Sequence, residues 1–307
     1  MPWTANDMGD LSGRTAVVTG ANSGLGLETA LELARHGATV VMACRNLEKG
    51  AQALAQVKES GGDGASLARL DLADLASVRE FAREIDATHP RLDMLINNAG
   101  VMAIPHRTTA DGFEMQLGTN HLGHFALTGL LLETLVRSPG ARIVNVSSMA
   151  NMIGYIRFGD LQSERRYSKW LAYGQSKLAN LLFTFEMDRR IRAAGKDLAS
   201  LAAHPGYAHT NLMSVGPEMA GATIQGRLIE GANRLLAQSA AQGALPTLYA
   251  ATDPKAESGE FIGPVLMGWG PPARSICSPA ARSASTARRL WEVSEELTQV
   301  SFDALRP

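Results

Sequence analysis

The stretch from Thr15 to Gly26 reads Thr-Ala-Val-Val-Thr-Gly-Ala-Asn-Ser-Gly-Leu-Gly, and it predicts how the rest of the chain folds. A β-prone apolar run at residues 16–18 leads into a loop with glycines at 20, 24 and 26, and an Ala- and Leu-rich helical pattern follows over residues 25–36. A strand, a turn and a helix in this order leave the first helical N–H groups unpaired at the positive end of the helix dipole. Such a turn can bind a diphosphate.

The glycine spacing is Gly-x-x-x-Gly-x-Gly, which differs from the G-x-G-x-x-G dinucleotide fingerprint. Glycine is required there wherever a Cβ atom would block the ligand or the backbone must be left-handed. A glycine-rich turn without a ligand is the alternative interpretation.

The composition indicates a globular protein, because 45% of the 307 residues are hydrophobic and the formal net charge is −1. No Lys/Arg-rich run suggests nucleic acid as a partner, and no apolar run reaches membrane-spanning length. The first ten residues lack the layout of a signal peptide, so a cytoplasmic location is expected.

The two cysteines, Cys44 and Cys277, are too far apart in sequence to indicate a disulfide framework or a metal-ligand spacing. His121 and His124 lie three apart on a predicted helix and could imitate a metal-binding pair. No Cys or carboxylate stands at ligand spacing beside them, so packing is favoured and no metal is expected.

Strand and helix patterns alternate along the chain, which predicts an α/β fold: a doubly wound parallel sheet (Rossmann fold) of about seven strands with helices on both faces. The strands are expected at residues 15–19, 39–43, 65–70, 94–97, 142–146, 198–203 and 260–262, and the helices at 25–36, 47–59, 75–88, 113–137, 173–194 and 242–252. One domain over residues 1–307 is expected, with an N-terminal tail (1–12) and a C-terminal irregular segment plus helix (268–307) that starts near Trp269.

The end of the second strand favours a phosphorylated dinucleotide. A site for the unphosphorylated cofactor usually carries a carboxylate there to bind the ribose 2′-hydroxyl. Residues 40–46 contain no acid but include Arg45, which can form charge-assisted bonds with a 2′-phosphate. The alternative is an exposed arginine at the start of a helix.

Six motifs follow one another along the chain: Thr19-Gly20-x-x-x-Gly24-x-Gly26, Asn97-Asn98-Ala99-Gly100, Asn120, Ser148, Tyr173-x-x-x-Lys177 and Pro205-Gly206. In this order they are typical of the short-chain dehydrogenase/reductase superfamily, which the chain resembles from Arg14 to about Pro264. The stretches at residues 21–26, 42–46, 143–148 and 172–180 are similar to those of its retinol dehydrogenase-like branch. Vertebrate members of that branch commonly carry a hydrophobic N-terminal anchor that this sequence does not show, so no transmembrane anchor is expected.

Tyr173 and Lys177 stand four residues apart, so a helix places both side chains over one face. Acid–base work near neutral pH requires the tyrosine pKa to fall from ~10 to ~7, which costs ~4 kcal/mol. One positive charge at ~4 Å supplies ~4 kcal/mol at an effective dielectric constant of ~20. Lys177 is therefore expected to favour the phenolate.

The resemblance implies catalytic roles for four residues and an NADP(H) cofactor. Tyr173 would exchange a proton with the substrate oxygen, Ser148 would hold that oxygen, Lys177 would also bind the nicotinamide ribose, and Asn120 would keep a proton-relaying water. The expected cofactor contacts are Gly20, Asn22, Ser23, Gly24, Leu25, Gly26, Arg45, Asn46, Asp71, Leu72, Asn98, Ala99, Gly100, Tyr173, Lys177, Pro205, Gly206 and Thr210.

Ser147 competes with Ser148 for the catalytic role, because neighbouring residues of a strand face opposite sides and only one can face the nicotinamide. The family register favours Ser148. The separation between Ser148 and Tyr173 is about twice that usual in the superfamily, and residues 151–171 include Tyr155, Phe158, Arg166, Tyr167 and Trp170. This insertion is expected to form a wall of the substrate pocket; an ordinary surface loop is the alternative.

The expected reaction is hydride transfer between NADP(H) and a small carbonyl or alcohol substrate with a non-polar part. Residues 211–240, rich in Met and Gly, occupy the place of a mobile substrate lid in relatives. Relatives pair through the helices equivalent to residues 113–137 and 173–194, and a homodimer or homotetramer is the assembly expected from this resemblance. A double-bond reductase related to protochlorophyllide reductases and a non-catalytic NADP-sensing protein are the alternatives.

Overall fold

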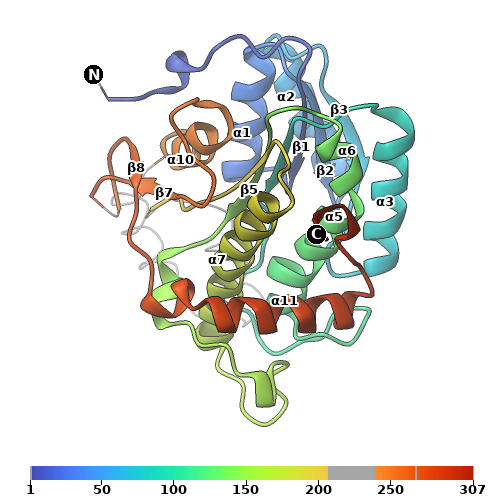
Figure 1. The fold of residues 1–307 in the computed structure, drawn as a ribbon. Helices are drawn as coiled ribbons and strands as arrows, with labels where there is room; N and C mark the ends of the chain where they lie inside the picture. Colours follow the sequence, from blue (N-terminus) through green and yellow to red (C-terminus); the bar gives the residue numbers. More distant parts are fainter. Residues whose placement is uncertain (1, 207–238, 267, 307) are drawn as a thin grey trace, which may run out of the picture.

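An eight-stranded sheet forms the centre of the computed structural model, which describes residues 2–206, 239–266 and 268–306 (Figure 1). The strand order is β3-β2-β1-β4-β5-β6-β7-β8. The strands are β1 (Thr15–Thr19), β2 (Thr39–Cys44), β3 (Ser66–Arg69), β4 (Met94–Asn97), β5 (Ala141–Val146), β6 (Leu198–Ala203), β7 (Phe261–Pro264) and β8 (Pro272–Arg274). All neighbours pair in parallel except β7 and β8, which are antiparallel. The predicted doubly wound sheet is confirmed.

Both faces of the sheet are covered, as the uninterrupted apolar character of the strands requires. Successive side chains of β1 enter different cores: Val17 packs in one buried cluster, and Ala16 and Val18 pack in another. The helices α1 (Gly24–Arg35), α2 (Leu47–Glu59) and α10 (Ala240–Thr252) cover one face (Figure 1). The helices α3 (Leu75–Thr88), α5 (Gly123–Leu130) and α7 (Lys169–Ala193) cover the other, and α11 (Ala284–Thr298) crosses α7.

The helix expected over residues 113–137 is interrupted. It consists of α4 (Met115–Leu117), a π-turn η2 (Gly118–Leu122), α5 and α6 (Leu132–Val136). A Cβ atom at Gly123 would lie 2.4 Å from the Leu72 carbonyl oxygen, so glycine lets the helix approach the loop after β3 closely. The helix expected over 173–194 begins earlier, at Lys169, and ends at Ala193.

The prediction of an irregular segment from Trp269 was wrong in part, because Pro272–Arg274 forms β8. Proline has no N–H to donate and is tolerated at a sheet edge, and β8 is the last strand of the sheet. Trp291 of α11 is buried against Phe302, with ring centroids 4.4 Å apart. The N-terminal segment is also packed: Met8 is buried, and Trp3 meets Tyr249 edge-on.

The remaining described elements are the short 3-10 turns η1 (Ala5–Asp7), η3 (Met149–Ile153), η4 (Phe158–Asp160), η5 (Pro279–Arg282) and η6 (Asp303–Leu305). Within the described ranges, no helix combines the length and the apolar character needed to cross a membrane.

Candidate functional site

The glycine-rich turn connects β1 to α1 and packs closely against the loop after β4. Gly20 has φ +68°, a left-handed conformation that favours glycine. A Cβ atom at Gly26 would lie 2.4 Å from the Gly20 carbonyl oxygen, so only glycine lets α1 pack this closely on the turn. The N-cap residue Ser23 makes no side-chain capping hydrogen bond, which leaves the first turn of α1 open to an anion.

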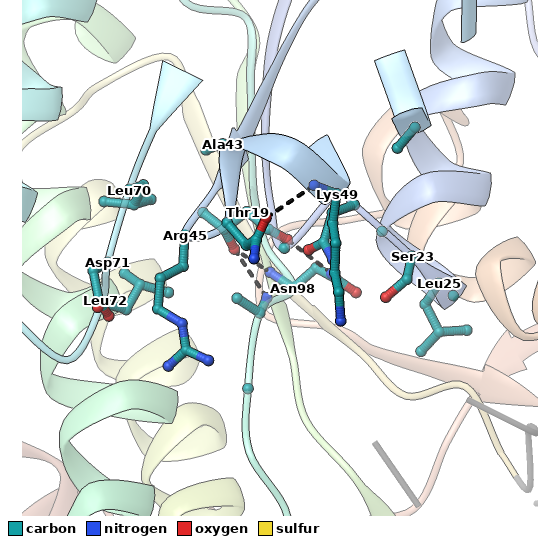
Figure 2. A pocket seen from close by; sticks show the side chains of 18 of the residues that line it. Thr19, Ser23, Leu25, Ala43, Arg45, Lys49, Leu70, Asp71, Leu72 and Asn98 are labelled. Carbon is teal, nitrogen blue, oxygen red and sulfur yellow. Dashed lines mark hydrogen bonds between the residues drawn. The ribbon is translucent and has the colours of Figure 1, made fainter. Parts of the chain in front are cut away.

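A cavity of about 580 Å³ lies over this turn, at the carboxyl ends of β1, β2 and β4 (Figure 2). The strand order reverses between β1 and β4, and ligands bind at such switch points in open α/β sheets. Thirteen of the expected cofactor contacts line the cavity: Gly20, Asn22, Ser23, Gly24, Leu25, Gly26, Arg45, Asn46, Asp71, Leu72, Asn98, Ala99 and Gly100. Its length along three strand ends and the open α1 terminus fit a dinucleotide.

Sequence reasoning missed a second cation in the cavity. Lys49 lines it together with Arg45, and both side chains are exposed (Figure 2). Lys49 lies in the first turn of α2, where its backbone N–H donates to the Asn46 side chain at 2.9 Å. Lys49 follows Arg45 by four residues, and this spacing in the sequence could have indicated that the two cations lie close together. Asp71 is the one carboxylate among the described residues that line the cavity, and its Oδ1 accepts from the Ala73 N–H at 3.0 Å.

The other lining residues were not among the expected cofactor contacts and contribute backbone, apolar, hydroxyl or amide surface: Thr19, Ala43, Gln52, Ala53, Gln56, Leu70, Val101 and Thr119. Thr19 joins the two motifs nearest the cavity (dashed lines in Figure 2). Its hydroxyl accepts from the Asn98 and Ala99 N–H groups, each at 2.9 Å, and its carbonyl accepts from the Asn98 side-chain amide at 2.8 Å.

The four candidate catalytic residues lie outside the lining of this cavity but next to its Gly100 end. A Cβ atom at Gly100 would lie 2.9 Å from the Asn120 Oδ1 and 3.7 Å from the Lys177 Nζ. The Asn120 amide donates to the Val101 carbonyl and to the Ser176 hydroxyl, both at 2.9 Å. Ser176 in turn donates to the Tyr173 carbonyl at 2.8 Å, so Asn120 contacts the turn of α7 that carries Tyr173.

The two serines after β5 face opposite sides. The Ser147 hydroxyl is buried and donates to the Lys177 carbonyl at 2.7 Å, beneath the site. The Ser148 hydroxyl is hydrogen-bonded to the Tyr173 phenol. The two serines therefore face opposite sides, as strand alternation predicts, and Ser148, which the family register favours, is the one beside the tyrosine.

Burial is the main cause of the shifted pKa values of Tyr173 and Lys177, both on α7. It raises the pKa of Tyr173 to about 12, although the Ser148 hydrogen bond acts in the opposite direction. It lowers the pKa of Lys177 to about 8. The Lys177 Nζ lies 5.8 Å from the Tyr173 ring centroid and donates to the Val146 carbonyl at 3.0 Å. Without a bound cofactor, the Tyr173 pKa therefore lies above its ordinary value, whereas Lys177 was expected to lower it together with the oxidised nicotinamide.

The insertion, residues 151–171, contacts two different parts of the structure. Trp170, which is 49% exposed, meets Tyr173 edge-on with ring centroids 6.4 Å apart. Phe158 instead packs under the Arg289 guanidinium of α11, 4.1 Å from its ring centroid. Trp170 therefore borders the candidate site, whereas Phe158 packs the insertion against the C-terminal helix α11.

The Pro205-Gly206 turn follows β6 and does not line the cavity. The Gly206 N–H donates to the His204 Nδ1 at 3.1 Å, and the His204 Nε2 contacts the Ser275 hydroxyl at 2.8 Å. A buried histidine thus ties this turn to the segment after β8. Thr210 and nearly all of the expected lid at 211–240 lie outside the described residues.

Comparisons with known proteins agree with this geometry. The family model for short chain dehydrogenase matches residues 14–219. The chain belongs to the short-chain dehydrogenase/reductase family of oxidoreductases. Within that family it falls in the retinol dehydrogenase-like branch: it is 44% identical to retinol dehydrogenase 12 of Homo sapiens, over 95% of this chain and 89% of the relative, and 43% identical to human retinol dehydrogenase 11, over 95% and 88%.

Solved structures show the same fold. A protein from Mycobacterium Paratuberculosis is 46% identical and superposes with a TM-score of 0.82, covering 98% of this chain and 99% of the other. A Pseudomonas aeruginosa protein, solved as an active-site complex with NADP, is 25% identical with a TM-score of 0.64, covering 83% of this chain and 95% of the other.

Proposed function

We propose that the protein is an NADP(H)-dependent oxidoreductase that interconverts a carbonyl group and an alcohol on a substrate with a non-polar part. The observation that supports this most is the meeting of Ser148, Tyr173, Lys177 and Asn120 at the Gly100 end of a dinucleotide-sized cavity. The matching retinol dehydrogenases are named for a reaction of this class.

The cavity offers a place for each part of NADP(H). The glycine turn and the open terminus of α1 would hold the diphosphate, and Asp71 and Leu72 lie where the adenine is expected. Arg45 and Lys49 would bind the 2′-phosphate, because no carboxylate of β2 or α2 is among the described residues that line the cavity beside these two cations. When bound, the nicotinamide supplies or accepts the hydride.

The residues at the Gly100 end of the cavity would transfer the proton to or from the substrate oxygen. With a pKa of about 12, Tyr173 stays protonated at neutral pH and can give its proton to a carbonyl oxygen as that oxygen gains charge. Ser148 can donate a second hydrogen bond to the same oxygen. Lys177, buried behind the phenol, stabilises the phenolate left behind, and Asn120 fixes the Val101 backbone next to both.

A non-polar substrate is supported by the exposed apolar side chains near Tyr173. Trp170 borders the phenol, and Leu171 beside it is 49% exposed. Ile153 approaches the same helix, since a Cβ atom at Gly174 would lie 3.2 Å from its Cγ1 atom, and Ile153 is 55% exposed. An apolar substrate would bury this surface.

The proposal is tested by following NADPH absorbance with a panel of apolar aldehydes and ketones in the dark. Turnover in the dark with formation of the alcohol supports carbonyl chemistry. NADPH binding without turnover of any carbonyl compound would contradict it.

The cofactor preference is tested by calorimetric titration of NADPH and NADH. We expect NADPH to bind at least roughly tenfold more tightly, because one charge-assisted phosphate contact contributes ~1.5–3 kcal/mol. Arg45→Ala and Lys49→Ala should each reduce this preference. Arg69→Ala is the matched control, since Arg69 is exposed on the neighbouring strand β3 but does not line the cavity. Equal affinities in the unaltered protein would refute the assignment.

A further inference from the structure

A buried histidine connects the two halves of the proposed site. The His124 Nδ1 lies 3.1 Å from the Asn120 carbonyl oxygen, and its Nε2 lies 2.9 Å from the Thr19 hydroxyl. The side chain is 2% exposed, so water does not complete its hydrogen bonding. Nδ1 therefore contacts the helical turn that carries Asn120, and Nε2 contacts Thr19 at the end of β1.

The partners determine which nitrogen of His124 carries the proton. A carbonyl oxygen only accepts, so Nδ1 must donate to Asn120. Burial lowers the pKa of His124 to about 4, so the ring is neutral at neutral pH and Nε2 is an acceptor. The Thr19 hydroxyl has one hydrogen and two candidate acceptors, Nε2 at 2.9 Å and the Ile96 carbonyl at 3.3 Å. The Thr19 hydroxyl therefore donates to the nearer acceptor, the His124 Nε2.

This donor direction leaves the Thr19 oxygen free to accept twice. It does so from the Asn98 and Ala99 N–H groups, which orients the turn that lines the cavity. On its other side the same turn is fixed by Asn120, whose side chain pairs with both the N–H and the carbonyl of Val101. His124 thus closes a loop of hydrogen bonds from Asn120 through Thr19 to residues 98–101 and back.

We propose that His124 is a positioning residue: as the neutral Nδ1–H tautomer it fixes the Thr19 hydroxyl, and through it the 98–101 turn, in register with Asn120. The proposal rests on the proposed function, since the turn it orients is the one expected to contact the cofactor. His124 does not line the cavity and acts through Thr19, which does.

His121 provides the matched comparison, because it is equally buried and stands three residues earlier. Its Nε2 contacts the Ser294 hydroxyl at 3.0 Å, and Ser294 donates its own hydrogen to the Leu290 carbonyl at 2.7 Å. His121 must therefore be the Nε2–H tautomer, opposite to His124. Its ring packs on Phe125 and Phe183, toward α11 and away from the cavity.

The first experiment is imidazole 15N NMR on the unaltered protein without added cofactor. We expect a protonated Nδ1 for His124 and a protonated Nε2 for His121, with assignments made from the His124→Phe and His121→Phe variants. A protonated Nε2 on His124 would overturn the proposal, because Thr19 would then have to accept from the ring instead of donating to it. The result does not depend on whether NADP(H) is the cofactor.

The second experiment compares the NADPH dissociation constants of variants by calorimetry. His124→Phe keeps an aromatic ring of similar volume but loses both hydrogen bonds, and we expect affinity to fall roughly tenfold, the effect of about one hydrogen bond. Thr19→Val, which is isosteric, should produce a similar loss, and the double variant should be no worse than either. His124→Gln, whose amide oxygen can accept from Thr19, should recover most of the affinity.

His121→Phe separates positioning from general stability. It should lower the melting temperature about as much as His124→Phe while leaving NADPH affinity within twofold of the unaltered protein. Equal losses of affinity in both variants, or additive effects of His124→Phe and Thr19→Val, would overturn the positioning role. Failure of the unaltered protein to bind NADPH would instead refute the proposed function, and the NMR result would still decide the tautomer.

Discussion

At the scale of single residues, the proposed chemistry depends on a few hydroxyl groups in a buried setting. Tyr173 is 5% exposed, and burial raises its pKa to about 12, so the protein alone holds it as a neutral phenol. Ser148 and Ser147 differ by one position in sequence and lie on opposite sides of the strand end. Single substitutions at Tyr173, Ser147 and Ser148 should therefore have different effects on rate and on stability.

Tyr173→Phe should abolish carbonyl turnover and leave NADPH affinity nearly intact, because the ring still packs but the transferable proton is lost. Lys177→Ala should reduce both the rate and the affinity, since its ammonium lies near the phenol and near Gly100 of the cavity. Steady-state kinetics and calorimetry measure the two effects. More than a few per cent of activity in Tyr173→Phe would require a different acid.

Ser148→Ala should lower kcat roughly 100-fold, by ~3 kcal/mol, because it removes a hydrogen bond to the substrate oxygen. Ser147→Ala should instead cost ~1 kcal/mol of folding stability and little rate, since its hydroxyl bonds the buried Lys177 carbonyl. Kinetics and urea unfolding of both variants separate the roles. The opposite ranking in kcat would show that the wrong serine had been assigned.

At the scale of elements, the insertion between β5 and α7 serves two different neighbours. Its C-terminal end reaches the site through Trp170, while Phe158 is held by Arg289 of α11. The Pro205-Gly206 turn depends in a similar way on the segment after β8, through the contact of His204 with Ser275. Long-range packing therefore shapes both of these borders.

Trp170→Ala should raise KM for the best apolar aldehyde roughly tenfold, ~1.4 kcal/mol, by removing an aromatic contact. Cofactor affinity should not change. Phe158→Ala is the control: it should lower thermal stability through the lost contact with Arg289 while leaving KM unaltered. A KM effect of equal size in Phe158→Ala would mean that the whole insertion lines the substrate pocket.

Gly263→Ala in β7 should destabilise the fold by roughly 1–3 kcal/mol, because the new Cβ atom would lie 1.8 Å from the Nε2 of the buried His204. The ring cannot move without losing its contacts with Ser275 and Gly206. Denaturant unfolding measures the loss. Gly159→Ala, where a Cβ atom meets nothing within 4 Å, should stay within about 0.5 kcal/mol of the unaltered protein; comparable losses in the two variants would refute the steric explanation.

At the scale of the whole molecule, distant parts of the chain share one core. The cluster on the α3, α5 and α7 face extends from Val17 to Leu305, so we propose that residues 1–307 form a single domain. On the same sheet, Asp93 lies buried at the start of β4 and holds β1 through the Thr15 N–H at 2.9 Å. Arg14 and Arg91 pair with it at the surface.

Asp93→Asn should lower the free energy of unfolding by roughly 2–3 kcal/mol at neutral pH, through loss of its charge-assisted hydrogen bonds. Burial alone would raise the Asp93 pKa, but hydrogen bonds from Arg91, the Thr15 N–H and Arg14 bring it below its ordinary value. A lowered folded-state pKa means that this stability is present above the unfolded-state pKa of ~3.9 and is lost as the pH falls through the folded-state value.

The difference between Asp93→Asn and the unaltered protein should therefore be constant above about pH 5 and shrink below about pH 4. Urea unfolding across this range tests it. Asp86→Asn is the control, because the Asp86–Arg137 pair is about half-exposed on both sides and should contribute less than about 1 kcal/mol. A pH-independent difference would show that the Asp93 charge is not the cause.

The sequence by itself determined the order of the first seven strands and of the main helices, the glycine turn and thirteen of the residues that line the cavity, because these depend on local pattern and on the rule that parallel strands present their carboxyl ends at one edge. Strand alternation also indicated that Ser147 and Ser148 face opposite sides, and the family register favoured Ser148. Only the tertiary structure decided that Tyr173 has a raised pKa, that Lys49 shares the cavity with Arg45, and that residues 272–274 complete the sheet. Burial, cavity shape and edge pairing each depend on residues far away in the chain, and no local pattern records them.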